Sequence, residues 1–351
     1  LCFFSRQVLL SMYLKLLAGC TPLTHFVYRR GIRMVSTIVG ESGRVYVRGE
    51  ALQRHYEDHT LSVFKAESGN QSFVVKRVPK AFYHLSMRLA DEFAGSQRLR
   101  IHIDCNKEEG ILVYPYYGST LLSLIQEDQD FPALERKKIL RATGEAIQEL
   151  HSKDWMHSDV KPDNILVNWT CDNHGLKLVT DVALGDFDIA HKSEAGQPRQ
   201  TPYAIGNAMW RSPEGQTGTV TKTSDIFSLG LVCIYALGGG DLLLINDYQE
   251  LTKSGTTAEQ EILTRHFSYF GSVSEGLLKQ VNSENWRRAL EAASAVAEQA
   301  VKEQPGLRFI HWGEELGPEA QDMIVGMTNP DPTARTTIDQ VLTHRWWREN
   351  T

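Results

Sequence analysis

Alternating apolar and polar positions predict a β-hairpin at residues 61–78. Residues 61–66 (Leu-Ser-Val-Phe-Lys-Ala) and 72–78 (Ser-Phe-Val-Val-Lys-Arg-Val) are rich in β-branched and aromatic residues. Between them, residues 67–70 read Glu-Ser-Gly-Asn, and Gly and Asn accept the backbone angles that a tight turn needs. The two runs are therefore expected to be neighbouring strands.

A helix and a further strand are expected to complete a small sheet. Residues 82–100 contain no proline, so an uninterrupted helix can form there. Residues 109–117 include the apolar run Ile-Leu-Val-Tyr, which predicts a strand that ends at Pro115 and Gly118. The N-terminal third is therefore predicted to be a small sheet with one helix.

The rest of the chain is predicted to be mainly helical. Residues 225–237 are apolar on nearly every side, which is typical of a helix that is buried all round. Other helices are expected after Pro132, at residues 286–301, after Pro318, and after Thr337, where Gln340 completes a capping box. Two strand-like runs, 165–167 and 176–184, are the exception.

The first 37 residues have a different pattern. Residues 1–17 are apolar, but Arg6 and Lys15 interrupt them, and three arginines follow. A membrane-spanning helix needs about 20 apolar residues, so no stable membrane span is expected. The stretch is either a mitochondrial-type presequence or weak signal anchor, or it is not native structure, with Met12 or Met34 as the true start. We favour the interpretation that the stretch is not native structure.

Composition narrows the functional classes. The chain has 351 residues, of which 42% are hydrophobic and 23% charged, and its net charge is -6. This length suits about two domains or lobes, and the mild acidic balance gives no electrostatic case for a nucleic-acid partner. The five cysteines lie far apart without metal-ligand or redox spacing, which favours a reducing compartment. We therefore expect a cytoplasmic location, with the nucleus as the alternative.

One polar run carries the strongest chemical signal. Residues 157–164 read His-Ser-Asp-Val-Lys-Pro-Asp-Asn, a strand-like segment follows, and residues 185–188 then read Gly-Asp-Phe-Asp. Phosphoryl transfer needs positive charge on the phosphates, oxygen ligands for Mg²⁺, and a group that orients the attacking hydroxyl. The Lys, Asn and Asp residues of these runs can supply all three.

This run resembles the catalytic loop of the eukaryotic protein kinase family, His-Arg-Asp-x-Lys-x-x-Asn. The resemblance implies that Asp159 accepts or orients the proton of the substrate hydroxyl, and that Lys161 neutralises charge on the transferring phosphoryl group. Asp186 matches the Asp of the family's Asp-Phe-Gly motif. It is expected to bind Mg²⁺ together with Asn164, because oxygen donors suit that ion. ATP and Mg²⁺ are the cofactors that this resemblance implies.

The same resemblance places the ATP-binding residues of the N-terminal third. Lys76, in Phe-Val-Val-Lys, matches the third-strand lysine that contacts the α- and β-phosphates. Glu92 on the predicted helix would pair with it, although Glu108 and Glu109 lie near enough in sequence for a register error to move that assignment.

The hinge between the lobes is expected at residues 114–117, Tyr-Pro-Tyr-Tyr, where adenine would hydrogen-bond to the backbone. Tyr114 takes the gatekeeper position, and Tyr116 and Tyr117 follow it. An equally compatible interpretation is that these aromatic residues simply pack between the lobes.

Later motifs follow in the family's order. Ser212-Pro213-Glu214 resembles Ala-Pro-Glu, and residues 331–335 resemble Asp-Pro-x-x-Arg; in the family this Glu and Arg form a buried ion pair. Residues 225–230 resemble Asp-x-Trp-Ser-x-Gly, whose Asp anchors the backbone of the catalytic loop from the start of the buried helix. An ion pair between Glu214 and Arg335 and an anchor at Asp225 are therefore expected.

Over residues from about 50 to 348, the resemblance implies an α+β fold with two lobes, a small β-rich N-lobe and a larger, mainly helical C-lobe. We divide the chain into an N-terminal extension at 1–37, the N-lobe and hinge at 38–117, and the C-lobe at 118–351. An insertion at about 240–316 either docks a partner or packs on the lower lobe. The motif set looks most like divergent fungal kinases.

Several positions depart from the family. Its glycine-rich loop maps to residues 56–63, Tyr-Glu-Asp-His-Thr-Leu-Ser-Val, which contain no glycine; glycines let backbone amides approach phosphates closely, so nucleotide affinity is in question. Ser158 replaces the Arg that binds an activation-loop phosphate, so phosphorylation there is not expected to be the obligatory switch. Asn207 replaces a Thr that contacts Asp159 and Lys161, and its amide can make similar hydrogen bonds.

We expect a Ser/Thr protein kinase that transfers the γ-phosphoryl group of ATP to protein substrates. Lys161 favours Ser/Thr acceptors, whereas Trp210 is found in tyrosine-kinase groups. The alternative is a pseudokinase that acts as a binding scaffold. The glycine-free loop favours it, but the retained catalytic residues oppose it. A small-molecule kinase is disfavoured by the Ser-Pro-Glu and Asp-Pro-x-x-Arg motifs.

Overall fold

The structure, a computed structural model, describes residues 36–54, 58, 61–194, 196–238, 240, 255 and 257–348. Almost all of the predicted N-terminal extension lies outside these residues, as do four of the eight positions that replace the glycine-rich loop (56, 57, 59 and 60) and most of the first part of the predicted insertion. The chain divides into two compact units. The first comprises the residues up to Arg88 together with His102–Tyr116, and the second comprises Leu89–Ile101 and the residues from Tyr117 onward.

The first unit is built on a six-stranded antiparallel sheet. Its strand order is β1 (Thr37–Val39), β2 (Val45–Gln53), β3 (Val63–Ser68), β4 (Gln71–Arg77), β6 (Ile111–Pro115) and β5 (Asp104–Asn106). The predicted hairpin is confirmed as β3 and β4, whose last pair is Ser68 with Gln71, and the predicted strand near 109–117 is β6. Strands β1, β2 and β5 were not predicted.

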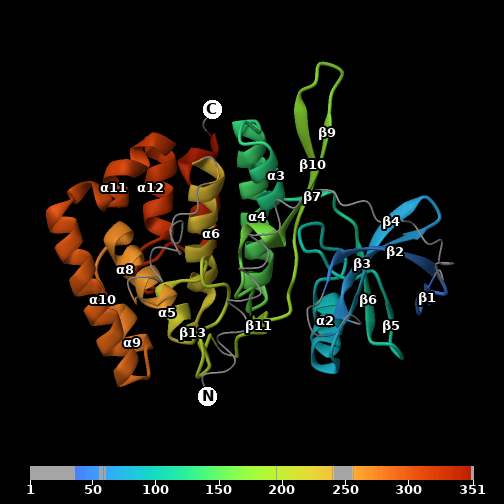
Figure 1. The fold of residues 1–351 in the computed structure, drawn as a ribbon, viewed down its shortest axis with the longest axis horizontal. Coiled ribbons are helices and arrows are strands. Elements are labelled where there is room, and N and C mark those ends of the chain that lie inside the picture. Colours follow the sequence, from blue (N-terminus) through green and yellow to red (C-terminus); the bar gives the residue numbers. More distant parts are fainter. Residues whose placement is uncertain are drawn as a thin grey trace. The chain divides into compact units, whose positions relative to one another are not determined.

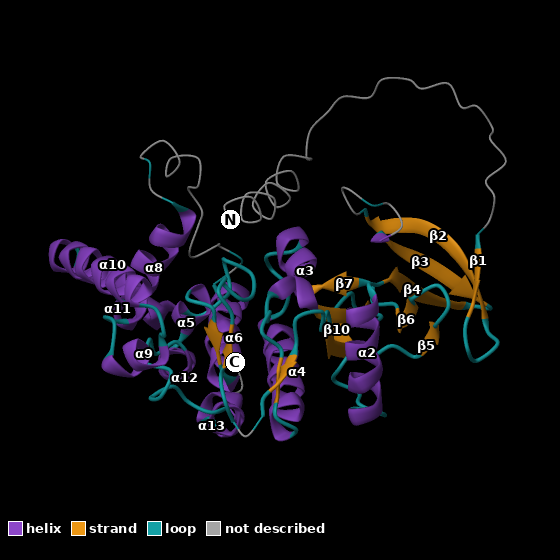
Figure 2. Ribbon diagram, turned by 90° about the horizontal axis from the view of Figure 1, so that it is seen from below, coloured by secondary structure: helices purple, strands orange, loops and turns teal. Residues whose placement is uncertain are grey.

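This sheet curls until its two edges meet. The backbone N–H of Glu41, just after β1, donates to the carbonyl of Cys105 in β5 at 2.7 Å, and Asn106 Nδ2 donates to the carbonyl of Val39 at 2.9 Å. The curled strands, drawn in orange in Figure 2, enclose a core that includes Ile38, Tyr46, Phe73, Val75 and Val113. The edge strand β1 therefore covers an apolar face that would otherwise meet water.

Helix α2 (Lys80–Glu92) covers the other side of the sheet, where Tyr83 packs with Val78 and Leu112. The prediction of a helix over 82–100 was wrong at its C-terminal end. Gly95 adopts φ 81°, in the left-handed region that ends helices. Leu99 then pairs with Leu184 as an isolated parallel bridge. A glycine in the left-handed conformation, rather than a proline, therefore follows the helix, and the chain beyond it is extended.

The second unit is mainly helical, as predicted. Its α-helices are α3 (Leu121–Glu127), α4 (Ala133–Ser152), α5 (Pro213–Gln216), α6 (Lys222–Leu237), α8 (Ala258–Phe270), α9 (Glu275–Gln280), α10 (Glu284–Glu303), α11 (Phe309–Trp312), α12 (Pro318–Met327) and α13 (Ile338–Thr343). Helix α6 lies between α4 and α12 (Figure 1). Every residue from Ser224 to Ala236 is buried, which confirms the helix predicted to be buried all round. None of the described helices is both long and apolar enough to cross a membrane.

The described part of the predicted insertion folds onto the rest of this unit. Helices α8 and α10 pack together around a core that includes Leu263, Phe267, Leu277 and Leu290. On its other side, α8 places Phe270 edge-on to Phe227 of α6, with ring centroids 5.7 Å apart. The described insertion is therefore an extra helical layer on the buried helix.

Short strands connect these helices. They are β7 (Ser119–Thr120), β8 (Trp155–Met156), β9 (Ile165–Cys171), β10 (Lys177–Leu184), β11 (His191–Lys192), β12 (Arg199–Gln200) and β13 (Thr219–Val220). The predicted pair at 165–167 and 176–184 is confirmed as the β9–β10 hairpin, although β9 is longer than predicted. The last pair at the base of the hairpin is Leu184 with Ile165. The two polar runs singled out in the sequence lie next to this pair. Residues 157–164 precede Ile165, and residues 185–188 follow Leu184.

Candidate active site

The loop at residues 157–161 lies between β8 and the 3₁₀ turn Pro162–Asn164. Asp225, in the first turn of α6, accepts the backbone N–H of His157 and that of Ser158, each at 2.8 Å. Ser158 adopts φ 65°, a strained conformation for a non-glycine residue that persists only where its surroundings impose it. The expected anchoring of this loop by Asp225 is confirmed.

His151 supports Asp225 from behind the loop. Its Nε2 lies 3.0 Å from Asp225 Oδ2, and both side chains are almost fully buried. A carboxylate in the first turn of a helix is also favoured by the positive end of the helix dipole. His151 was not among the residues predicted from the sequence. Its position at the end of the predicted amphipathic helix after Pro132 could have indicated it, because a polar residue on a buried face needs a partner.

Both carboxylate oxygens of Asp159 are held in place. Oδ2 lies 2.9 Å from Lys161 Nζ, and Oδ1 accepts the backbone N–H of Asn207 at 2.8 Å. Asn164 Nδ2 adds contacts to the Asp159 carbonyl at 2.9 Å and to Oδ2 at 3.3 Å. The Asp159 side chain is 13% exposed, so a group from solvent or substrate still reaches it.

The charge of Lys161 is secured by its surroundings. Burial lowers the pKa of Lys161, but Asp159, with Asp163 and Asp186 nearby, outweighs that effect and holds the pKa above its ordinary value. The ammonium group therefore stays protonated throughout the neutral range. The attraction from Asp186 also shows that three of the predicted site residues, Asp159, Lys161 and Asp186, share one region.

Backbone pairing brings Asn164 and Asp186 together. Just beyond the last pair of the β9–β10 hairpin, the N–H of Gly185 donates to the carbonyl of Asn164 at 2.9 Å. Asp186 follows directly, with φ 64°. Phe187 is buried and its ring lies 5.1 Å from that of His157, while His157 Nε2 lies 2.9 Å from the Gly185 carbonyl. The Asp-Phe segment is therefore fixed against the loop that carries Asp159.

The residues present fit a magnesium ion. Asn164 uses Nδ2 for its bonds to Asp159, so the amide is oriented with Oδ1 facing away from them. Together with the Asp186 carboxylate, this gives two hard oxygen donors, and Mg²⁺ commonly binds through few protein ligands while it keeps several waters. Within the described residues, no three His, Cys, Asp or Glu side chains form a metal-binding group, which is compatible with such a sparse site.

The segment at residues 206–211 closes over the loop. Gly206 adopts φ 84°, and a Cβ placed there would lie 2.5 Å from the Ser158 carbonyl oxygen, so only glycine fits. The contact from Asn207 to Asp159 was expected from its side-chain amide. The structure shows a contact to Asp159 from the backbone N–H of Asn207, and Asn207 Oδ1 accepts the N–H of Met209 at 3.0 Å.

Arg211, in this segment, is a functional candidate that sequence analysis missed. Its Nη1 donates to the Gly206 carbonyl at 3.2 Å, while its buried Nε has no hydrogen-bond partner among the described residues. Burial lowers the pKa of Arg211 to about 10, against the attraction of Glu259 and Asp159. A largely buried guanidinium with so few bonds is costly, and it lies in the segment that contacts Asp159.

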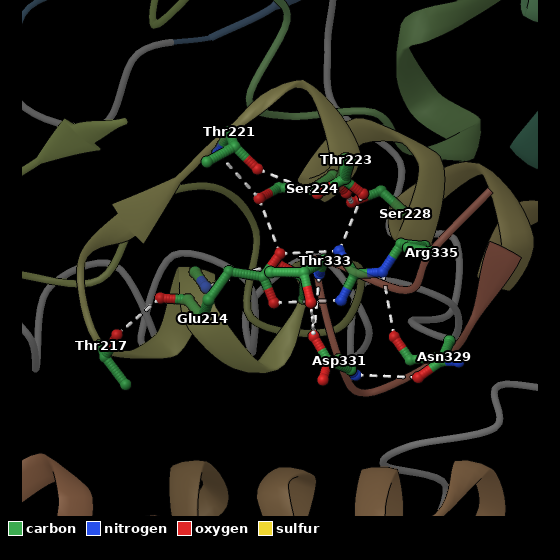
Figure 3. Close-up of polar contacts among 12 residues, drawn as sticks. Glu214, Thr217, Thr221, Thr223, Ser224, Ser228, Asn329, Asp331, Thr333 and Arg335 are labelled. Carbon is green, nitrogen blue, oxygen red and sulfur yellow. Dashed lines mark hydrogen bonds and ion pairs between the residues drawn. The ribbon is translucent and has the colours of Figure 1, made fainter. Parts of the chain in front are cut away.

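The expected ion pair between Glu214 and Arg335 is confirmed (Figure 3). Arg335 Nη1 lies 2.7 Å from Glu214 Oε1, Nη2 lies 3.2 Å from Oε2, and neither side chain is exposed. Ser224 Oγ donates to Oε1 at 2.7 Å, and Arg335 Nε donates to the Asn329 carbonyl at 3.0 Å. The pair joins α5 and the start of α6 to the segment before α13.

The predicted ATP-binding residues are divided between the two units. In the first unit, Lys76 lies in β4, opposite Val63 and Leu112. Tyr114 lies in β6, with its ring centroid 6.3 Å from that of His102. The ammonium group of Lys65 lies 4.8 Å from the centre of the Tyr116 ring. In the second unit, burial and a hydrogen bond to Asp181 hold the pKa of Tyr117 above its ordinary value.

Glu92 has partners within the second unit. Its Oε2 lies 2.7 Å from Lys192 Nζ and accepts the indole N–H of Trp155 at 2.8 Å. Lys76 and Glu92 belong to different units, so their pairing stays a prediction. Any such pair would share a carboxylate that Lys192 and Trp155 already hold.

The connection between β2 and β3 is where the family's glycine-rich loop was predicted. Residues 54–62 join these strands and contain no glycine. The register of β3 with β4 sets Val63 opposite Lys76.

Comparisons with known proteins identify the family of the chain. The protein kinase domain model matches residues 63–347. The chain is 26% identical over 216 residues to the sensor for unfolded proteins in the ER, ire1, of Schizosaccharomyces pombe, covering 53% of this chain and 20% of that protein. It is 37% identical over 124 residues to human MAP kinase-activated protein kinase 2, covering 35% and 29%.

A serine/threonine-protein kinase of Phytophthora infestans, PKZ1, is 25% identical over 240 residues, which is 65% of this chain and 48% of that protein. The chain thus spans between a fifth and a half of these relatives. A solved structure, the yeast RNA Pol II CTD kinase CTDK-1 complex, contains a chain that matches with a TM-score of 0.64 at 14% identity, over 94% of this chain and 98% of that one. The fold and the family model agree, and the chain belongs to the protein kinase domain family.

Proposed function

We propose that this protein kinase transfers the γ-phosphoryl group of ATP to serine or threonine hydroxyls of protein substrates. The observation that carries the proposal is the fixed position of the Asp159 carboxylate. Its carboxylate is fixed between Lys161 Nζ and the backbone N–H of Asn207, on a loop that Asp225 anchors to a buried helix. A general base needs this kind of fixed position before its pKa matters.

The proposed step is a direct displacement. The substrate hydroxyl oxygen forms a bond to the γ-phosphorus, the bond from that phosphorus to the oxygen bridging it to the β-phosphate breaks, and ADP leaves. Asp159 takes the hydroxyl proton. Lys161, whose pKa is held above its ordinary value, keeps its positive charge beside the transferring group.

The remaining site residues would bind the nucleotide and its metal. Asn164 and Asp186 would hold Mg²⁺, which neutralises charge on the phosphates when bound. Lys76 would contact the phosphates, with Glu92 as its partner, and Tyr114, Tyr116 and Tyr117 would border the adenine.

The acceptor preference rests on two opposed sequence features. Lys161 is the residue expected of Ser/Thr kinases, and Trp210 is shared with tyrosine groups. In the structure Trp210 is buried against Tyr235, with ring centroids 5.6 Å apart. A packing role accounts for Trp210 without any bearing on the acceptor, which supports Ser/Thr.

The test is transfer from γ-labelled ATP to three peptide pools with Ser, Thr or Tyr as the only acceptor. We expect Mg²⁺-dependent labelling of the Ser and Thr pools by the native chain. Asp159→Asn should lower kcat by about 100-fold or more, the usual contribution of a general base. Asp91→Asn, at an exposed position in α2, is the matched control and should leave kcat unchanged. Labelling that is absent, or that survives in Asp159→Asn, would refute the proposal.

A scaffold function is the second candidate, and the glycine-free connection at 54–62 favours it. Without glycines, backbone amides approach the phosphates less closely. Calorimetric titration with Mg²⁺ and ATP separates the two candidates. Binding together with transfer supports the kinase, whereas a folded chain that neither binds nor transfers supports the scaffold.

A further inference from the structure

The first unit contains a cavity beside β1. Glu41 and Asn106 bridge β1 and β5 with hydrogen bonds, so the sheet curls on itself. Ser36 beside β1 and Glu109 beside β6 both line a cavity of about 210 Å³. Residues of β1, β2, β3, β4 and β6 complete its lining.

This cavity lies on the sheet face opposite to Lys76. Val75 and Arg77 both line it, and they flank Lys76 in β4. Successive side chains of a strand point to opposite faces. The cavity is therefore separate from the phosphate contact proposed for Lys76.

Positive charge dominates its entrance. Arg77 Nη2 lies 2.7 Å from Glu109 Oε2, but the two side chains are 40% and 46% exposed, and an ion pair this exposed is weak enough to be exchanged for another anion. Arg48 has no carboxylate partner among the described residues, and its guanidinium lies 4.5 Å from the centre of the Phe64 ring. Two cations thus face one loosely held carboxylate.

A β-bulge sets the position of Arg48. Arg48 pairs with Ala66, but the next aligned pair is Ala51 with Phe64, so β2 has an extra residue at this point. A bulge bends its strand and re-aims the side chains next to it. The guanidinium of Arg48 reaches the ring of Phe64, two positions along β3 from its pairing partner Ala66.

The inner wall of the cavity is apolar. Ile38, Val75 and Ile111 line it, and each is at most 5% exposed. Drug-sized ligands occupy pockets of roughly 300–1,000 Å³, so this cavity suits a smaller molecule of about the size of an amino acid. Apolar side chains next to two guanidiniums, one of them 4.5 Å from the centre of an aromatic ring, match a ligand with a ring and an acidic group.

We propose that this cavity binds a small molecule that carries an aromatic ring and one carboxylate or phosphate group. The ring packs on Ile38 and Ile111, and the anion lies between Arg48 and Arg77, where it replaces Glu109 as the partner of Arg77. Guanidinium groups bind carboxylates and phosphates with paired, charge-assisted hydrogen bonds.

The test follows the isoleucine methyl signals of the full chain by NMR, without ATP. Benzoate and phenyl phosphate are the probes, and benzyl alcohol and inorganic phosphate are the controls that lack the anion or the ring. We expect saturable shifts of Ile38 and Ile111 with at least one of the two probes, and much smaller shifts with both controls. Arg48→Gln and Arg77→Gln should each weaken binding by roughly tenfold or more.

Arg44→Gln is the matched control variant. Arg44 also stacks on an aromatic ring of this sheet, that of Phe73 at 5.4 Å, but it does not line the cavity, so its loss should leave binding unchanged. If Arg48→Gln fails to fold, Arg48→Lys replaces it and should still weaken binding, because Lys loses the flat contact with Phe64. Absence of saturable shifts, equal shifts with inorganic phosphate, or an equal loss in Arg44→Gln would overturn the proposal.

Discussion

Asp225 accepts the backbone N–H of His157 at 2.8 Å. This contact ties the loop that carries Asp159 to the first turn of α6, a helix that is buried from Ser224 to Ala236. A loop is normally the most mobile part of a fold, whereas this one has its backbone fixed to a rigid element. The position of the proposed base therefore depends on a residue that lies far from it in sequence.

Replacing that anchor should affect stability and catalysis together. Asp225→Ala removes the acceptor for two backbone N–H groups and the partner of His151. Buried donors left without a partner cost several kcal/mol in total, so we expect a loss of about 3 kcal/mol in the free energy of unfolding. The kcat should fall at least tenfold in the fraction that stays folded. Urea unfolding and steady-state kinetics measure the two effects.

Asp225→Asn gives a graded comparison, because its amide oxygen still accepts one of the two N–H groups. We expect its losses to lie between those of the native chain and of Asp225→Ala. Asp91→Ala, at an exposed position, should stay within about 0.5 kcal/mol of the native chain. Full activity in Asp225→Ala would show that the loop does not need this anchor.

Gly206 should tolerate no side chain. With φ 84° and a Cβ position 2.5 Å from the Ser158 carbonyl oxygen, Gly206→Ala adds both backbone strain and a collision with the catalytic loop. We expect kcat to fall more than tenfold. Gly196→Ala separates the two causes, because Gly196 has φ 74° and nothing lies within 4 Å of its Cβ position. It should cost about 1 kcal/mol of stability and leave kcat unchanged.

The catalytic segments were predictable because their motifs resemble those of the protein kinase family, and several of their contacts are made by residues close together in sequence. Asp159, Lys161 and Asn164 lie within six positions, and the β9–β10 hairpin carries Asp186 back to them by local pairing. The Glu214–Arg335 pair joins distant residues. The family resemblance alone predicted this pair, and the burial of both side chains explains why each needs the other.

Other features depend on packing that no local pattern carries. In β2 only Tyr46 is fully buried among nine residues, so no clear alternation marks the strand, and β1 is held by bonds to the distant β5. Whether Asn207 uses its amide or its backbone N–H on Asp159 depends on the turn that Gly206 permits. No sequence pattern marks Arg211 as buried, because its burial arises from the tertiary fold alone.

The Glu214–Arg335 pair should make the free energy of unfolding depend on pH in acid solution. Burial raises the pKa of Glu214, but Arg335 and the Ser224 hydroxyl outweigh it, so its pKa in the folded chain lies below the ordinary 4.5. A carboxylate with a lowered pKa contributes stability that is complete above pH 4.5 and is lost as the pH falls through the folded value. The free energy of unfolding of Glu214→Gln should therefore depend less on pH in this range.

At neutral pH the same variant leaves Arg335 buried without its counter-charge. We expect Glu214→Gln to lose about 3–5 kcal/mol of stability. The double variant Glu214→Met/Arg335→Met should recover much of this loss, because it leaves no unpaired charge. Guanidinium chloride unfolding at pH 7 compares the three chains. A double variant as unstable as Glu214→Gln would show that packing, rather than charge, causes the loss.

His266 should be a source of acid instability in α8. Its ring is fully buried and edge-on to Phe227, with centroids 5.0 Å apart, and neither ring nitrogen has a hydrogen-bond partner among the described residues. Burial, with the nearby charges of Arg335 and Arg211, lowers its pKa to about 3 from the ordinary 6.5. The unfolded chain therefore gains a proton at this residue below pH 6.5, and the folded chain does not, so stability falls as the pH falls. Between pH 7 and pH 5 this amounts to about 2 kcal/mol.

His266→Phe tests this origin directly, because phenylalanine keeps the ring contacts and does not titrate. We expect its free energy of unfolding to change less between pH 7 and pH 5, by about 2 kcal/mol, than that of the native chain. His174→Gln, which alters an exposed histidine in the β9–β10 turn, should keep the native pH dependence. Thermal or urea unfolding across this range measures the difference. An unchanged slope in His266→Phe would mean that His266 is hydrated or protonated in the folded chain, contrary to its burial.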